Sequence, residues 1–315
     1  MPKYRTNLPQ LSPERLFISD GGVETTLVFH DGVDLPEFAA FTLLKDAEGS
    51  ALLRKKFADY ADIARRRGIG IILESSTWRA NSDWGARLGY SADKLARANE
   101  KAIELLEDIR NEYEDDKTPV VISGMIGPRG DGYDPKSFMT EGEATEYHRP
   151  QIETFAKTNA DMVGAQTMTY AEEAIGIVRA ANKSGMPVMI GFTVETDGKL
   201  PSGGLLKDAI ARVDAATDNY PLYYMINCAH PTHFKQVINP DATWVNRIYA
   251  VRANASIKSH AELNESAVLD EGDPVDLGKQ YKELRGIMPK LHILGGCCGT
   301  DPRHVDEIAK ACTAG

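Results

Sequence analysis

Short apolar stretches alternate with longer amphipathic stretches along this chain, and no other feature restricts its fold as strongly. The short stretches are mostly apolar throughout, as expected of strands that are covered on both faces. The longer ones repeat apolar residues every three or four positions, which indicates helices. Strands that alternate with helices in this way are parallel. Eight strands are expected, at residues 15–19, 69–75, 119–125, 161–167, 187–194, 222–228, 247–254 and 291–296.

Three of the helix candidates have a regular apolar spacing, and they cover residues 50–67, 91–113 and 173–185. The third ends at Gly185 with Pro187 after it, which is a strong stop signal. Eight strand–helix units in 315 residues fit a (β/α)8 TIM barrel better than an open doubly wound sheet. Because no Pro-, Gly- or Ser-rich linker divides the chain, we expect one α/β domain over residues 1–315.

The composition is that of a globular protein, with 42% hydrophobic and 26% charged residues. The N-terminal residues lack an apolar signal segment, and no run approaches the roughly 18 apolar residues of a membrane span. These features predict a cytoplasmic protein without a membrane partner. The net charge of −10, with scattered Lys and Arg, disfavours nucleic acid as a partner.

Two segments that follow expected strands are predicted to be long loops, at residues 81–90 and 127–140. A barrel of this type carries its active site at the rim where the strands end. Loops at this rim are therefore candidates for a lid over the site.

The four cysteines are too few and too unevenly spaced for a disulfide framework. Cys228 ends the sixth expected strand, and Cys297 and Cys298 end the eighth. The same barrel rim should therefore carry all three thiols. Cys312 lies in a helix pattern near the C-terminus and is expected to be structural.

Glycines at 295, 296 and 299 permit backbone torsions that would let both adjacent sulfurs turn toward one ion. Three thiolates around a zinc ion leave one tetrahedral position for substrate. A zinc ion with three sulfur ligands is a poor generator of hydroxide but a good partner for an incoming thiol. The metal keeps that thiol ionised, and the thiolate can attack a methyl group. The alternative is that the cysteines are small buried apolar side chains.

Five motifs together resemble the homocysteine S-methyltransferase family, and the resemblance covers nearly the whole chain. The paired cysteines and the preceding Asn–Cys are the most specific of them. The motifs are DGGVETTL (20–27), SGMIGPRGD (123–131), SGGLLKDAI (202–210), INCAHP (226–231) and GGCCGTDPRHV (295–305).

The resemblance implies that Cys228, Cys297 and Cys298 are catalytic zinc ligands on a barrel. It also implies methyl transfer from a sulfonium or ammonium donor to the thiol of homocysteine, giving methionine. S-methylmethionine, S-adenosylmethionine and betaine-like compounds are the donors that this chemistry suggests. The expected partners are thus a small thiol and a methyl donor, and a homo-oligomer stays open.

Asp20 carries over from the family as the group that receives the amino group of the thiol substrate. Gly21 and Gly22 would let the backbone approach the ligand. The alternative for Asp20 is a turn residue. Asn227 and Asn254 stand where the family has amides and would orient ligand or loop, or else cap a helix.

One departure from the family lies after the fourth strand, where Gln166 and Thr167 stand in place of the usual glutamate and threonine. A neutral amide accepts a hydrogen bond from an ammonium group but does not offset its charge. Another small thiol or a selenol therefore stays open as acceptor. Glu172 or Glu173 would supply the negative charge that Gln166 lacks, unless these residues occupy the first turn of the next helix.

Trp78 and Arg79 follow the second strand at the rim. Because an indole face attracts a cation by about 0.5–2 kcal/mol, Trp78 is predicted to form a wall of the donor site, or else to be a half-buried packing residue. His230 and His233 are alternative metal ligands, although the HPTH sequence is also typical of a helix start.

Three other functions stay open. A corrinoid-linked module would take its methyl group from a separate protein. A zinc hydrolase would prefer His and carboxylate ligands. A non-catalytic protein would use the cysteines to sense oxidation.

Overall fold

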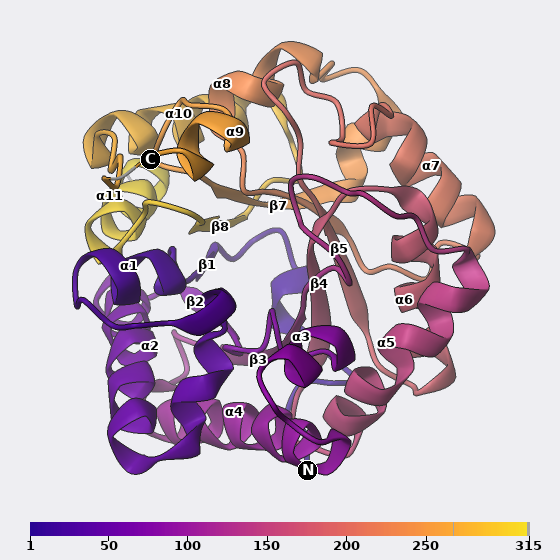
Figure 1. Cartoon of the computed structure of the whole chain (residues 1–315). Coiled ribbons are helices and arrows are strands. Elements are labelled where there is room, and N and C mark those ends of the chain that lie inside the picture. The colour runs from indigo at the N-terminus through magenta and orange to yellow at the C-terminus, as the bar shows by residue number, and fades with distance from the viewer. Residues whose placement is uncertain (267, 314–315) are drawn as a thin grey trace.

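The computed structural model of the chain describes residues 1–266 and 268–313 and forms a closed barrel of parallel strands (Figure 1). The strands pair in sequence order, and β8 pairs with β1 to close the barrel. The barrel predicted from the sequence is confirmed, and every predicted strand overlaps an observed one, with ends that differ by up to two residues. The strands are β1 Phe17–Ser19, β2 Gly70–Glu74, β3 Val120–Ile126, β4 Met162–Met168, β5 Val188–Phe192, β6 Tyr224–Asn227, β7 Ile248–Ala253 and β8 Ile293–Gly296.

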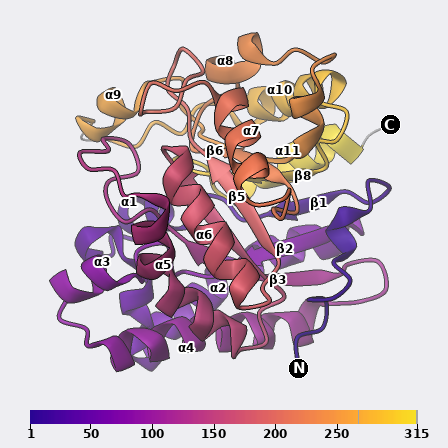
Figure 2. The same ribbon diagram turned by 90° about the vertical axis from the view of Figure 1, so that its right-hand side faces the viewer.

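Helices surround the strands, as the view turned by 90° also shows (Figure 2). The three regular helix candidates are confirmed as α2, α4 and α6. No helix within the described residues is both long and apolar enough to cross a membrane. The helices are α1 Val23–Phe29, α2 Ala47–Arg67, α3 Ser82–Arg87, α4 Ala92–Tyr113, α5 Glu141–Ala156, α6 Ala171–Lys183, α7 Leu206–Ala216, α8 Pro231–Phe234, α9 His260–Asn264, α10 Pro274–Ile287 and α11 Pro302–Thr313.

One predicted loop is wrong, because the segment 81–90 contains α3. Asn81 begins this helix, and its side-chain oxygen accepts a hydrogen bond from the backbone N–H of Trp84 at 3.4 Å. Residues 127–140 are irregular, as predicted, up to the start of α5.

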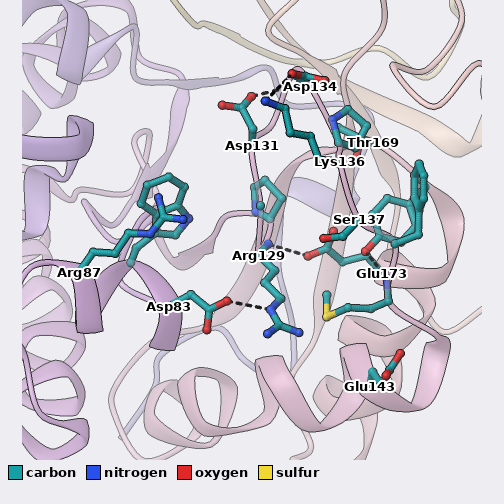
Figure 3. Close-up of a pocket in the computed structure, with 17 residues that line it drawn as sticks. Asp83, Arg87, Arg129, Asp131, Asp134, Lys136, Ser137, Glu143, Thr169 and Glu173 are labelled. Atoms are coloured by element: carbon teal, nitrogen blue, oxygen red, sulfur yellow. Dashed lines mark hydrogen bonds and ion pairs between the residues drawn. The ribbon is translucent and has the colours of Figure 1, made fainter.

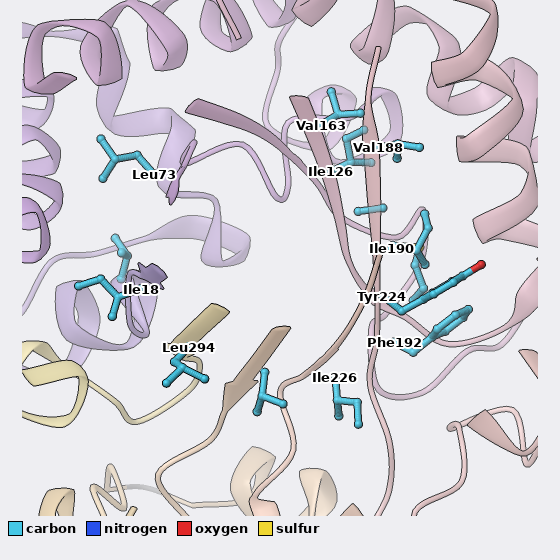
Figure 4. Packing of buried hydrophobic residues seen from close by; sticks show 14 of the residues in the cluster. Ile18, Leu73, Ile126, Val163, Val188, Ile190, Phe192, Tyr224, Ile226 and Leu294 are labelled. Atoms are coloured by element: carbon cyan, nitrogen blue, oxygen red, sulfur yellow. The ribbon is translucent and has the colours of Figure 1, made fainter. Parts of the chain in front are cut away.

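Alternate strand residues face outward and pack against the helices (Figure 4). The other set faces the barrel interior, where one layer is almost wholly apolar. The N-terminal segment packs against this layer through Leu8 and Tyr4. The interior apolar residues of the strands are Phe17, Ile72, Val121, Met162, Met189, Met225, Ala250 and Ile293.

The next interior layer, two residues further along each strand, is polar, and we call it the polar layer. Side chains two residues apart share a face of a strand, so this layer lies between the apolar layer and the rim. Its side chains are Ser19, Glu74, Ser123, Asn227 and Arg252, with Gln166 one further step along β4 and glycines at 164, 191 and 295.

Candidate metal centre

Three sulfurs from two separate strands meet at the rim of the barrel. The Sγ atoms of Cys228, Cys297 and Cys298 all lie within 4.8 Å of one another. The Cys228 and Cys298 sulfurs are 3.5 Å apart, far beyond a disulfide bond. Cys228 follows β6 directly, and the other two follow β8. The sequence-based prediction that one rim carries all three thiols agrees with this geometry.

The distances fit a zinc site. Zinc–sulfur bonds of about 2.3 Å in a tetrahedron separate the sulfurs by about 3.8 Å. Small side-chain movements would reach this geometry from the observed spacing. Hydrogen bonds from Cys228 and Cys298, together with the nearby Arg252 charge, lower the pKa of the Cys297 thiol. The hydrogen bond to Cys297 raises the pKa of the Cys228 thiol, and the pKa of Cys298 is also raised by Cys297 and by burial. Cys297 is therefore the thiol of the set that is favoured as a thiolate, the form that binds a metal.

The backbone at Cys228 is held in an unusual conformation, with φ at 57°. Its carbonyl oxygen accepts hydrogen bonds from Asn254 Nδ2 at 3.0 Å and from Thr193 Oγ1 at 3.4 Å, and it lies 2.5 Å from His260 Nε2. These contacts keep the Cys228 sulfur aimed at the other two. Asn254 thus orients the cysteine turn, one of the two roles predicted for it.

Gly21 and Gly22 bring the turn after β1 against the turn that holds the paired cysteines. A Cβ atom at Gly22 would lie 2.5 Å from the Cys297 carbonyl oxygen. The Gly22 N–H donates to the carbonyl oxygen of Thr300 at 3.0 Å. Beyond this turn, Gly299 adopts φ 77°, a conformation that favours glycine. The close approach at Gly22 is therefore between two segments of the chain.

Tyr133 covers the sulfurs from the long loop 127–140. Its hydroxyl lies 2.9 Å from Cys228 Sγ and 3.9 Å from Cys298 Sγ. Its ring packs on His260, with ring centroids 4.4 Å apart. The loop thus lies over the three sulfurs, in the position of the predicted lid. No sequence signal distinguished Tyr133 from the rest of its loop.

Asp20 is buried and forms an ion pair with Arg252 of β7, with Oδ1 and Nη2 3.0 Å apart. Arg252 also donates to the carbonyl oxygens of Gly296, at 2.9 Å, and Gly21, at 3.2 Å. Burial raises the pKa of Asp20 to about 6, although Arg252 opposes this shift. The acid expected to receive an amino group therefore already has a cationic partner. Sequence reasoning missed Arg252, whose only signal was a charge inside an apolar strand.

Gln166 and Thr167 lie at an irregularity between β4 and β5. Thr167 has φ at 64°, which is rare for a β-branched residue. The Asn227 side chain holds it, accepting from the Thr167 N–H and donating to its Oγ1, both at 2.9 Å. Asn227 therefore orients this turn beside Cys228.

Trp78 is half-buried, and its Nε1–H donates to the carbonyl oxygen of Gln166 at 3.4 Å. The Arg79 guanidinium lies 4.2 Å from the centre of the Trp78 ring and 3.7 Å from that of Trp84. One face of the Trp78 indole thus already contacts a cation of the chain.

The histidines predicted as alternative ligands do not join the sulfur group in the described part of the chain. His230 caps α8, and His233 Nε2 lies 2.8 Å from the Ile257 carbonyl oxygen. Glu172 and Glu173 lie in the first turn of α6, as their alternative interpretation held. Glu172 pairs with Arg212 at 2.6 Å, and Glu173 lies 2.9 Å from His148 Nε2. Neither compensates for Gln166.

A second group of potential ligands comprises His30, Glu271 and Asp301. Arg303 forms ion pairs with Glu271 at 3.1 Å and with Asp301 at 2.5 Å. Because a guanidinium already neutralises these acids, the group is better explained as an ion-pair network.

A cavity of about 500 Å³ lies beside the long loop, between α3 and the start of α6 (Figure 3). About half of its lining residues are charged, among them Arg87, Arg129, Asp131 and Glu173. The three cysteines do not line it, so it is separate from the sulfur cluster.

The chain matches known proteins along nearly its whole length. The family profile described as homocysteine S-methyltransferase matches residues 17–312. Homocysteine S-methyltransferase 4 of Zea mays is 24% identical, over 93% of this chain and 88% of the relative. Betaine–homocysteine S-methyltransferase 1 of Bos taurus is also 24% identical, over 96% of this chain and 74% of the relative.

A solved structure has the same fold. The metallated form of the homocysteine methyltransferase MmuM from Escherichia coli superposes with a TM-score of 0.73, over 94% of this chain and 96% of that chain. The two sequences are 18% identical, so the likeness concerns the barrel alone.

Proposed function

Since the chain belongs to the homocysteine S-methyltransferase family, we propose that this methyltransferase transfers a methyl group to the thiol of homocysteine, giving methionine. The donor in this proposal is a sulfonium or ammonium compound such as S-methylmethionine, S-adenosylmethionine or betaine. The convergence of the three cysteine sulfurs is the observation that carries it.

Zinc is the metal that we propose for this site, held by Cys228, Cys297 and Cys298. A zinc ion with three thiolate ligands would keep the acceptor sulfur ionised at neutral pH. A set of only sulfur ligands favours zinc over magnesium or calcium, which take oxygen ligands. Three thiols that must stay reduced also support a cytoplasmic location.

The remaining chemistry is alignment. The acceptor thiolate attacks the donor methyl carbon in line, and the donor's sulfide or amine leaves with the electron pair of the broken bond. The contacts to the Cys228 carbonyl fix the sulfur side of this geometry. Tyr133 covers the sulfurs, and its loop would exclude water around the reacting atoms.

Two alternatives follow from particular features. The amide at Gln166 keeps another small thiol or a selenol open as acceptor. A donor carried on a separate corrinoid protein would leave the isolated chain inactive with every free donor. The sulfur ligands disfavour a zinc hydrolase.

A panel of free donors with homocysteine, assayed for methionine with and without a chelator, tests the proposal. At least one donor should give methionine, and chelation should abolish the product. Cys298→Ala should lose zinc and activity together, whereas Cys312→Ala on α11 serves as a matched control that keeps both. Turnover by a zinc-free Cys298→Ala protein would refute the metal-dependent mechanism.

A further inference from the structure

Four buried polar atoms of the polar layer have no hydrogen-bond partner among the described residues. They are Ser19 Oγ, Glu74 Oε2, Ser123 Oγ and Gln166 Nε2, and none of these residues is more than 3% exposed. The four residues come from the consecutive strands β1, β2, β3 and β4. Because a buried polar group without a partner destabilises the fold, such a cluster suits a ligand that carries both donors and acceptors.

Glycines on the neighbouring strands let the side chains of this cluster lie close to the backbone. A Cβ atom at Gly164 would lie 3.0 Å from Ser123 Oγ and 3.2 Å from Glu74 Oε2. A Cβ atom at Gly295 would lie 2.0 Å from Ser19 Oγ. We call the group of these four side chains, together with Gly164 and Gly295, the polar chamber.

The polar chamber lies next to the metal centre. Arg252 connects the two, since it donates to the carbonyl oxygen of Gly296, the residue before Cys297, and to Gln166 Oε1 at 3.3 Å. In the strand register, Arg252 also pairs with Asn227, the residue before Cys228. A small thiol bound at the sulfurs would therefore extend its polar end toward this chamber.

Arg252 fixes which atom Gln166 presents to the chamber. A guanidinium only donates hydrogen bonds, so the amide must turn its oxygen toward Arg252. Its Nε2 then remains as a donor on the side of the Glu74 carboxylate, whose pKa the Gln166 side chain lowers. A donor suits a carboxylate and repels an ammonium group, so Gln166 cannot replace a glutamate that binds an amine.

Glu74 provides the opposite charge. Asp20 already pairs with Arg252, whereas no ion pair involves Glu74 within the described residues. Burial raises the pKa of Glu74 to about 7, although Arg252 and the neighbouring Ser123 and Gln166 side chains oppose the shift. A buried carboxylate without a cationic partner is costly, and a bound cation would offset that cost.

We propose that the polar chamber binds the head of an α-amino acid thiol, with Glu74 receiving its ammonium group and Gln166 Nε2 donating to its carboxylate. Glu74 is thus the residue that selects an amino acid over a simple thiol, and Arg252 is a positioning residue that orients Gln166. This inference rests on the proposed thiol methylation, but it places the amine contact on β2 rather than on Asp20 or Gln166.

The test compares homocysteine with 4-sulfanylbutanoate, the same thiol without the amino group, in Glu74→Gln and wild-type enzyme. The wild type should favour homocysteine in kcat/KM by at least about 10-fold. Glu74→Gln should lower kcat/KM for homocysteine by about 10–100-fold, mainly through KM, because a uniform binding contact is lost. It should leave the value for 4-sulfanylbutanoate within about 3-fold.

Glu24→Gln is the matched control. Glu24 is also an acid near Asp20 and Arg252, but it lies in the first turn of α1 and outside the polar chamber. Its replacement should leave the preference for homocysteine unchanged. Calorimetric titration of the zinc-loaded proteins with both thiols should give the same ranking without turnover.

Equal losses on both thiols in Glu74→Gln would overturn the inference, as would loss of the preference in Glu24→Gln. If Glu74→Gln does not fold, the wild type still decides, because equal use or binding of the two thiols refutes the inference. If neither thiol is methylated with any donor, the proposed function fails, while the titrations still test the chamber.

Discussion

Arg252 on β7 reaches across the barrel and donates a hydrogen bond from Nη1 to Oε1 of Gln166 on β4, at 3.3 Å. The same guanidinium pairs with Asp20 after β1. One cation therefore links three strands beneath the cysteine turns. The electrostatics of the interior depend on it, since it offsets one buried acid and leaves Glu74 without a partner.

Replacing Arg252 should destabilise the protein strongly. Arg252→Met leaves the Asp20 carboxylate buried and unpaired, and breaking such a pair costs about 3–5 kcal/mol. Urea unfolding should show this loss, and the double variant Asp20→Asn/Arg252→Met should recover part of it. An Arg252→Met protein as stable as the wild type would show that the pair contributes nothing.

The Glu74→Gln substitution should stabilise the ligand-free protein at alkaline pH. The pKa of Glu74 is raised from 4.5 to about 7, so the folded state holds a proton that the unfolded state has released. Stability therefore falls as the pH rises from about 4.5 through 7, by about 3 kcal/mol for this group. Glutamine stays neutral and avoids that loss.

Melting temperatures of the two proteins at pH 5 and pH 8 measure this effect. The gain in Glu74→Gln should be present at pH 8 and nearly absent at pH 5. A gain of equal size at both values would point to packing rather than to ionisation.

The strands and the sulfur cluster could be predicted because their signals are local. Apolar stretches mark the strands, and a parallel barrel brings all their carboxyl ends to one rim, so Cys228 and Cys297 meet although they are far apart in sequence. The replacement of the family's glutamate by Gln166 could be recognised for the same reason, because Gln166 stands at the end of a strand.

The contacts that Arg252 makes across the barrel, with Gln166 and Asp20, could not be predicted in the same way. Glu74 and Arg252 are single charges in apolar strands, and only the closed barrel shows that both point inward. Tyr133 lies in a loop whose path depends on contacts with His260 and the cysteines. Segment 81–90 lacked a long apolar period, yet the Asn81 cap begins a short helix there.

Tyr133 should slow the loss of zinc from the loaded protein. Its ring covers the sulfurs and its hydroxyl lies within hydrogen-bond distance of Cys228 Sγ. Tyr133→Ala should release zinc to excess chelator several times faster than the wild type, and Tyr133→Phe should be intermediate because the ring remains. Tyr147→Phe, which removes a hydroxyl bonded to Asn81, is the matched control. Unchanged release in Tyr133→Ala would exclude a covering role.

Trp78 and Arg79 should act on the methyl donor in opposite directions. The indole attracts a sulfonium or quaternary ammonium ion, so Trp78→Ala should raise the donor KM by about 2–30-fold, equivalent to about 0.5–2 kcal/mol. The Arg79 guanidinium, 4.2 Å from the ring centre, repels the same cation and competes for the indole. Arg79→Met should therefore lower the donor KM.

Steady-state kinetics at saturating homocysteine would separate the two effects, with the KM for homocysteine as the internal control. Opposite shifts in donor KM mean that the indole binds the donor directly. A different outcome is that both substitutions raise the KM for the donor and the KM for homocysteine together. Trp78 and Arg79 would then have only a packing role at the rim, because a loss of packing there would disturb the loop 127–140 and weaken the binding of both substrates equally. Gly132 of that loop approaches the Trp78 ring, so such a disturbance would also accelerate zinc release, which the chelator assay detects.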